Sequence, residues 1–193
     1  MEIKRPESKQ PMPADAKKVF AGKMFDVYQW EQKMFDGTFV TFERIKRADT
    51  VVTFPVLPDG RILLLKQRQP NTGEFISGAG GRMDQGEEPL EAAKRELFEE
   101  TGYKADDWML LDAVQPVGKI EWAVYTFVAK GLRKVGAQTL DGGEKISLYP
   151  VTFDEFLSMG MNQSFSEDEI KSRLMQALLQ PEKKAELLKT FTP

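Results

Sequence analysis

Three glutamates lie close together between residues 81 and 103. Glu96, Glu99 and Glu100 are three and four positions apart, so on an α-helix their side chains project from one face. Like charges at this spacing destabilise a helix by about 0.2–0.5 kcal/mol per pair, and a divalent cation would turn that repulsion into binding. The spacing therefore indicates either a metal site or an ordinary solvated acidic surface.

The chain of 193 residues contains no cysteine and no histidine. This composition excludes cysteine nucleophiles, Ser-His-Asp triads, imidazole bases and zinc sites made of Cys and His. Acid–base chemistry must come from carboxylates, Lys, Tyr or water on a metal ion. Because any metal ligands must be oxygen atoms, we expect a hard cation, Mg²⁺ or Mn²⁺, as the cofactor.

The overall composition argues against several classes of partner. The formal net charge is −3, whereas general nucleic-acid binders are usually basic. No apolar run approaches the roughly 20 residues needed to cross a bilayer, and residues 1–18 lack the apolar stretch of a secretory signal. We therefore expect no nucleic-acid partner, no membrane partner and a cytoplasmic location.

Turn signals separate a series of predicted strands. Asp36-Gly37 is a tight-turn dipeptide between β-rich runs at 27–33 and 38–44, which predicts a hairpin. After an apolar strand at 51–57, the run Ile62-Leu63-Leu64-Leu65 predicts a strand buried on both faces. Further strands are expected at 108–114, 122–128 and 145–151.

Helix signals place the three glutamates on a helix. Pro89 suits its first turn and Gly102 its C-terminal cap. At about 100° per residue, Leu90, Ala93 and Leu97 form the buried stripe, and the acids face a cleft or solvent.

The C-terminal part of the chain carries further helix starts. The sequences 152–155 and 166–169 both have the Ser/Thr-x-x-Glu form of a capping box, and Pro181 suits the start of another helix. The order of strands, helix, strands and helices predicts a mixed α/β fold with a sheet between helices.

The acidic segment matches a known pattern along its whole length. It reads Gly81, five residues, Glu87, seven residues, and then Arg95-Glu96-Leu97-Phe98-Glu99-Glu100-Thr101-Gly102-Tyr103. This resembles the Nudix box, the signature of the Nudix hydrolases. At the position of Tyr103 the family more often has an aliphatic residue. The resemblance implies a Nudix α/β/α sandwich with a mixed sheet, and it favours the metal site over the solvated surface.

The resemblance also assigns roles to individual residues. It implies metal ligation at four positions, namely Gly80, through its backbone carbonyl, Glu96, Glu99 and Glu100. It implies structural support of the site by Gly81 and by an ion pair between Glu87 and Arg95, which ties the loop to the helix.

Residues 20–160 are similar to the ADP-ribose pyrophosphatases and their nucleotide-sugar relatives. The matching features are the N-terminal hairpin and four segments, namely Leu64–Gln69, Ala79-Gly80-Gly81, Pro116–Glu121 and the loop that carries Glu144. The chain departs from the pattern at Gln69, where the family has an arginine, although Arg68 lies one position earlier. It also departs at Ala79, a proline in the family, and at Val117, which separates Pro116 from Gly118.

This branch resemblance implies hydrolysis of the diphosphate bond of ADP-ribose or a related nucleoside diphosphate sugar, giving a nucleoside monophosphate and a sugar phosphate. Glu144 is the expected general base, with Glu99 or Glu100 as the alternative; Glu144 is otherwise an ordinary loop acid. The expected substrate contacts are Trp30, which would stack on the base, Arg44, Arg47, Arg68, Gln69 and Glu121. Surface ion pairs for the arginines, and a core or interface position for Trp30, are the competing interpretations.

The family resemblance further implies a homodimer, because related enzymes exchange their N-terminal hairpins. We accordingly divide the chain into a flexible tail at 1–18, a β-hairpin dimerisation subdomain at 19–48, and a Nudix hydrolase domain with C-terminal helices at 49–193. GDP-mannose and dinucleoside polyphosphates are the alternative substrates. A non-catalytic nucleotide-sugar sensor is the alternative of another class. A Cys₄ zinc ribbon, typical of the NADH-cleaving type, is impossible without cysteine.

Overall fold

Strand β5 (Ile62–Arg68) shows how the sequence sets the layers of the fold. In this computed structural model, which describes residues 3–193, Ile62 and Leu64 join one hydrophobic cluster and Leu63 and Leu65 join another. Successive side chains of a strand point to opposite faces, so β5 is buried on both sides, as its unbroken apolar run predicts.

Two central sheets contain most of the strands. A four-stranded sheet has the order β7 (Ala79–Arg82), β4 (Thr50–Pro55), β11 (Val124–Lys130) and β9 (Asp107–Val114). Strands β4 and β11 are parallel and the other pairs antiparallel, which makes this sheet mixed. An antiparallel sheet has the order β13 (Lys145–Val151), β5 and β6 (Phe75–Ser77).

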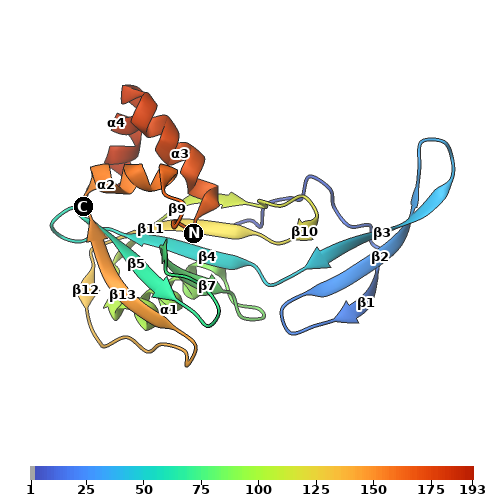
Figure 1. Cartoon of the computed structure of the whole chain (residues 1–193), viewed down its shortest axis with the longest axis horizontal. Helices are drawn as coiled ribbons and strands as arrows, with labels where there is room; N and C mark the ends of the chain where they lie inside the picture. Colours follow the sequence, from blue (N-terminus) through green and yellow to red (C-terminus); the bar gives the residue numbers. More distant parts are fainter. Residues whose placement is uncertain (1–2) are drawn as a thin grey trace.

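Helices cover both faces of these sheets (Figure 1). Helix α1 (Pro89–Thr101) packs on β7 and β4 through residues that include Ala92, Ala93 and Leu97. The opposite face is covered by α2 (Phe153–Ser158), a 3₁₀ turn (Met159–Met161), α3 (Asp168–Leu179) and α4 (Pro181–Thr190). The predicted α/β/α sandwich with a mixed sheet is confirmed. Within residues 3–193, no helix combines the length and apolarity needed to span a membrane.

The predicted hairpin is present and extends away from the helices (Figure 1). Strands β2 (Asp26–Lys33) and β3 (Phe39–Lys46) pair antiparallel, β1 (Lys17–Ala21) pairs with β2, and β10 (Ile120–Glu121) adds a short parallel ladder to β3. Since β10 leads into β11, this ladder joins the hairpin sheet to the main domain. A two-stranded sheet of β8 (Tyr103–Lys104) and β12 (Arg133–Lys134) completes the strands that the structure describes.

The N-terminal segment contacts the body of the protein. Ile3 packs against the core under α1, and Arg5 forms ion pairs with Asp49 and Glu121. We predicted a flexible tail at 1–18, of which residues 1–2 lie outside the described residues. The contacts of residues 3–8 favour a held segment instead, and the domain boundaries stay predictions.

Of the two predicted capping boxes, one is present and one is wrong. Thr152 accepts a hydrogen bond from the backbone N–H of Glu155, whose carboxylate accepts one in return from the backbone N–H of Thr152. Helix α3 instead begins at Asp168, its N-cap is Glu167, and no side chain caps it within the described chain. Ser166 does not act as the cap because its hydroxyl donates to the carbonyl of Ile76 and to Glu167.

Gly102 ends α1 in a conformation that suits glycine. Its φ of 70° is left-handed, and a Cβ at this position would lie 2.3 Å from the carbonyl oxygen of Gly136. Gly86, with φ 81°, has a similar conformation but no atom within 4 Å of such a Cβ. Substitution of either glycine should therefore strain the backbone, and only a substitution at Gly102 adds a steric clash.

We predict that Gly102→Ala destabilises the protein more than Gly86→Ala. The left-handed conformation should cost about 1–2 kcal/mol in both variants, and the clash should add a similar amount in Gly102→Ala alone. Urea unfolding followed by circular dichroism measures both. Equal losses of unfolding free energy would show that the contact with Gly136 has no energetic weight.

Candidate metal and substrate site

Glu100 is fixed against the loop that precedes the acidic helix. Its Oε2 accepts a hydrogen bond of 2.7 Å from the backbone N–H of Gly80 in β7, and only 4 % of the residue is exposed. The sequence placed Glu100 toward a cleft or solvent with the other two acids. The structure corrects this, because Glu100 points into the protein whereas the Glu99 side chain is 40 % exposed.

Burial makes the negative charge at this site costly. It raises the pKa of Glu100 to about 9, against the opposing effect of the Gly80 N–H, and the charges of Glu96, Glu144 and Glu167 add to the rise. Burial also raises the pKa of Glu96, which the neighbouring Arg95 counteracts. A cation at this position would relieve the cost of both ionised carboxylates.

Arg95 connects the acids of the helix to the preceding loop. Its Nε and Nη2 donate to the two carboxylate oxygens of Glu87 at 2.9 and 3.0 Å, so the predicted ion pair is present and bidentate. Its Nη1 also donates to Glu96 at 2.8 Å and to Glu99 at 3.1 Å. These bonds raise the pKa of Arg95, and Nη1 bridges two of the predicted metal ligands.

The predicted ligands suit a hard cation in type but are not gathered around one point. In residues 3–193, no group of three or more acidic side chains is placed to hold a metal ion. Glu96 and Glu99 are joined by Arg95, and Glu100 is turned to Gly80. The donor set of carboxylates and backbone oxygen fits Mg²⁺ or Mn²⁺, and a Cβ on Gly81 would lie 2.6 Å from Glu96 Oε1, so a larger residue at this position would displace the Glu96 carboxylate.

Glu144 lies in a loop beside the acidic helix. It lines a cavity of about 530 Å³ together with Arg68 and Gln69, because β13 pairs with β5 and brings Lys145 opposite Arg68. The charge of Glu144 acts on both Glu96 and Glu100. The structure therefore brings the predicted base beside Arg68 and within electrostatic range of two of the acids.

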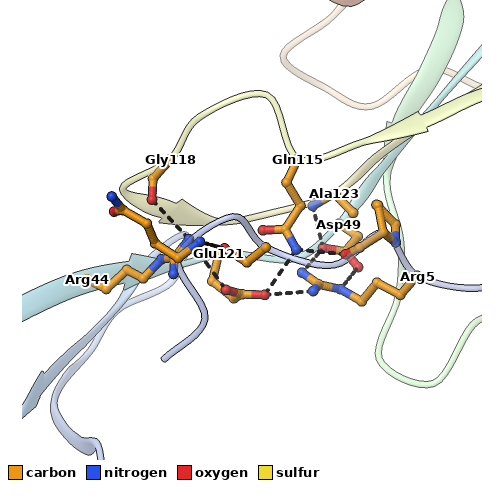
Figure 2. A network of polar contacts seen from close by, with 10 residues as sticks. Arg5, Arg44, Asp49, Gln115, Gly118, Glu121 and Ala123 are labelled. Atoms are coloured by element: carbon orange, nitrogen blue, oxygen red, sulfur yellow. Dashed lines mark hydrogen bonds and ion pairs between the residues drawn. The ribbon is translucent and has the colours of Figure 1, made fainter. Parts of the chain in front are cut away.

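Arg44 and Glu121 belong to a polar network that holds the N-terminal segment (Figure 2). The Arg44 side chain is buried and donates to Ser8 at 2.6 Å and to the carbonyl of Gly118 at 3.0 Å. Glu121 accepts from Arg5 at 2.6 Å, and its second oxygen lies 3.7 Å from Arg44. Both predicted substrate residues thus already have protein partners.

Arg47 and Trp30 have contrasting positions. The Arg47 guanidinium lies 4.7 Å from the centre of the Trp122 ring, and no described residue forms an ion pair with it. Trp30 lies in β2, paired with Phe42, and its indole N–H donates to Gln32 at 3.1 Å. Figure 1 shows that β2, the strand that carries Trp30, extends away from α1, the helix that carries the acids.

Four side chains at the site were missed by sequence reasoning. Gln67 is buried and donates to Ser77 at 2.6 Å and weakly to Glu100 at 3.5 Å. Trp122, Glu167 and Glu169 line a cavity beside Gly80. Gln67 lies two positions after Leu65 on the same face of β5, which places it on a buried face, but no spacing in the sequence relates β5, Trp122 and the start of α3.

Comparisons with known proteins place these features in a family. The NUDIX domain pattern matches residues 46–173, well over half of the chain. An ADP-ribose pyrophosphatase of Bacillus subtilis (strain 168) is 30% identical over 144 residues, which cover 73% of this chain and 78% of the relative. A methanol dehydrogenase activator of Bacillus methanolicus is 29% identical over 143 residues, covering 72% and 77%.

A solved structure supports the same fold. A crystal structure of an ADP compounds hydrolase superposes with a TM-score of 0.69 and covers 94% of this chain and 98% of its own. At 20% sequence identity, this likeness shows the fold.

We predict that the metal-free protein loses stability as pH rises from about 5 to about 9. Folding raises the pKa of Glu167 to about 7 and of Glu100 to about 9, so the folded state retains protons that the unfolded state releases. Each group contributes a slope of up to about 1.4 kcal/mol per pH unit. Urea unfolding with a chelator at several pH values measures the slope.

Glu100→Gln should flatten this dependence above about pH 8, where Glu167 has largely titrated. Glu167→Gln should reduce the slope below pH 7 and leave the part that Glu100 contributes. An unchanged slope above about pH 8 in Glu100→Gln would contradict the assignment.

Proposed function

Because this chain belongs to the NUDIX domain family, we propose that it hydrolyses the diphosphate bond of ADP-ribose or a related nucleoside diphosphate sugar. The products are a nucleoside monophosphate and a sugar phosphate. The similarity to an ADP-ribose pyrophosphatase over most of both chains supports this substrate class. GDP-mannose and dinucleoside polyphosphates are the substrates to test beside it.

One observation carries the proposal, namely the uncompensated acid held against the glycine loop. Glu100 is buried and bonded to the Gly80 N–H, and Glu96 and Glu99 lie on the same helix within reach of Arg95. A fold gains no stability by burying a carboxylate with a raised pKa. The arrangement is explained by a cation that meets a diphosphate at this place.

A divalent cation, Mg²⁺ or Mn²⁺, is the proposed cofactor, held by the carboxylates of α1 and the carbonyl of Gly80. When bound, it supplies positive charge against the diphosphate oxygens and lowers the pKa of a water. The chain itself positions this chemistry through the Glu87–Arg95 ion pair, which fixes the loop 82–87 to α1. Glu144, in the loop beside this site, takes the proton from the attacking water as general base.

We predict that Glu99→Gln abolishes most of the activity and that Glu91→Gln does not. Glu91 lies on the same helix, is exposed and pairs with Lys94, so its substitution removes the same charge away from the site. Loss of a metal ligand should lower kcat/KM for ADP-ribose by at least about 100-fold. Release of AMP with and without Mg²⁺ measures both variants.

Equal low rates in the wild type and Glu99→Gln, with ADP-ribose still bound, would favour a nucleotide-sugar sensor over an enzyme. Glu144→Gln in the same assay separates the base from the metal ligands. As a base, Glu144 should affect kcat while the concentration of Mg²⁺ that gives half-maximal rate stays unchanged.

We also propose a homodimer whose hairpin sheets contribute to the partner's substrate site. Exposed apolar side chains on this sheet support an interface, namely Val19, Phe20, Phe39 and Val40. A cytoplasmic location, expected from the composition, is tested by cell fractionation.

We expect twice the chain mass of 21.9 kDa in sedimentation. If Trp30 stacks on the base, Trp30→Ala should raise KM for ADP-ribose about 10-fold with little change in kcat, because base stacking contributes about 1–3 kcal/mol. A monomer with unchanged KM in Trp30→Ala would exclude this arrangement.

A further inference from the structure

A second cavity lies beside the acidic site and is lined by a different set of residues. It holds about 420 Å³, and its walls include Gly80 and Gly81 of the box loop, Trp122, Arg47 and the start of α3. Gly80 is the residue whose N–H holds Glu100, so the cavity adjoins the glycine loop of the acidic site. Its volume suits part of a nucleotide sugar.

One wall of this cavity is aromatic and cationic. The Arg47 guanidinium stacks on Trp122 at 4.7 Å and lies 5.9 Å from the ring centre of Phe25, and its Nε is buried without a hydrogen-bond partner among the described residues. Burial and the nearby Arg82 lower the pKa of Arg47, and no acidic side chain in residues 3–193 forms an ion pair with it. A phosphate group of the substrate is the anion that fits it.

Two carboxylates with free oxygens also line this cavity. Glu167 Oε1 accepts from the Gly78 N–H at 3.2 Å and from the Ser166 hydroxyl at 3.0 Å, which orients the group and leaves Oε2 without a donor in residues 3–193. Glu169 is half-buried and receives no hydrogen bond from any other residue that the structure describes. These oxygens are therefore available to hydrogen-bond donors of a ligand.

We propose that Glu167 and Glu169 recognise the vicinal hydroxyls of a ribosyl group in the substrate, with Glu169 as the main determinant of specificity. The proposal rests on the proposed function, because it places the ribosyl group next to the diphosphate. A carboxylate accepts from both hydroxyls of a ribose diol and rejects analogues that lack one. Arg47 then lies on the phosphate side of the same cavity, and Trp122 contacts the sugar or base face.

The hydroxyls can come from either of two sources, the nucleoside ribose or the distal ribose of ADP-ribose. Steady-state kinetics of the full chain with three substrates distinguishes them: ADP-ribose, its 2′-deoxy analogue and its 2″-deoxy analogue. Glu169→Gln should raise KM for ADP-ribose at least about 10-fold with kcat within a factor of about two, since a hydrogen bond to a charged group is lost. With the analogue that lacks one of the two contacted hydroxyls, Glu169→Gln should raise KM by a smaller factor than with ADP-ribose, whereas the other analogue should give the full rise.

Asp168→Asn is the matched control. Asp168 lies one position earlier in the first turn of α3, its side chain is 82 % exposed, and it pairs with Lys171 at 2.6 Å outside the cavity. The Asp168→Asn substitution removes the same charge from the same helix end and should leave KM for ADP-ribose unchanged. Glu167→Gln provides a second cavity variant with the same expected direction if Glu169→Gln folds poorly.

Three outcomes overturn the proposal. The first is an unchanged KM in both cavity variants. The second is the same rise in KM with both deoxy analogues and with ADP-ribose. The third is that the cavity variants need a higher concentration of Mg²⁺ while their KM for ADP-ribose is unchanged. This result would indicate that Glu167 and Glu169 bind a cation and not the sugar.

Calorimetry of ADP-ribose binding in the Glu99→Gln background separates this test from the proposed function. If the wild type hydrolyses nothing, Glu169→Gln should still weaken binding about 10-fold there, and the same Kd with and without Glu169→Gln would overturn the proposal.

Discussion

The hydrogen bond from the Gly80 N–H to Glu100 is the contact on which the site depends. It joins β7 to the last turn of α1 and fixes a carboxylate whose burial raises its pKa to about 9. The surrounding structure maintains this position, because Leu97 and Ala93 anchor one side of the helix in the core. Strand β7 supplies Gly80, and no residue with a side chain fits at this position, since a Cβ on Gly80 would lie 2.1 Å from the Val51 carbonyl oxygen.

The hairpin sheet and the main domain meet at a network of polar residues. The hairpin sheet is joined to the main domain by the short β3–β10 ladder and by the network of Arg5, Asp49, Arg44 and Glu121 (Figure 2). Asp49 also accepts from the Ala123 N–H at 2.8 Å, directly before β11. The N-terminal segment thus fastens the start of β4 to the start of β11, so the position of Arg47 and Trp122 depends on residues near the chain's beginning.

Local signals in the sequence were sufficient to predict the helices and strands. They were insufficient to predict which residues line the site. Pro89 and Gly102 defined α1, and the run 62–65 defined a strand buried on both faces, because these features depend on neighbours in the chain. The Glu87–Arg95 pair followed from a motif. The burial of Glu100 did not follow, since it depends on how β7 packs on α1. The role of Glu167 was missed because Ser166 bonds to β6, a contact across 90 positions.

Arg95 gives the resting protein its own internal counter-ion. Its Nη1 spans Glu96 and Glu99 while its Nε and Nη2 hold Glu87, so one positive charge is shared among three carboxylates. A divalent cation bound by Glu96 and Glu99 would compete with Nη1 alone for their oxygens. The bidentate pair with Glu87 would then keep the loop attached to the helix whether or not such a cation is present.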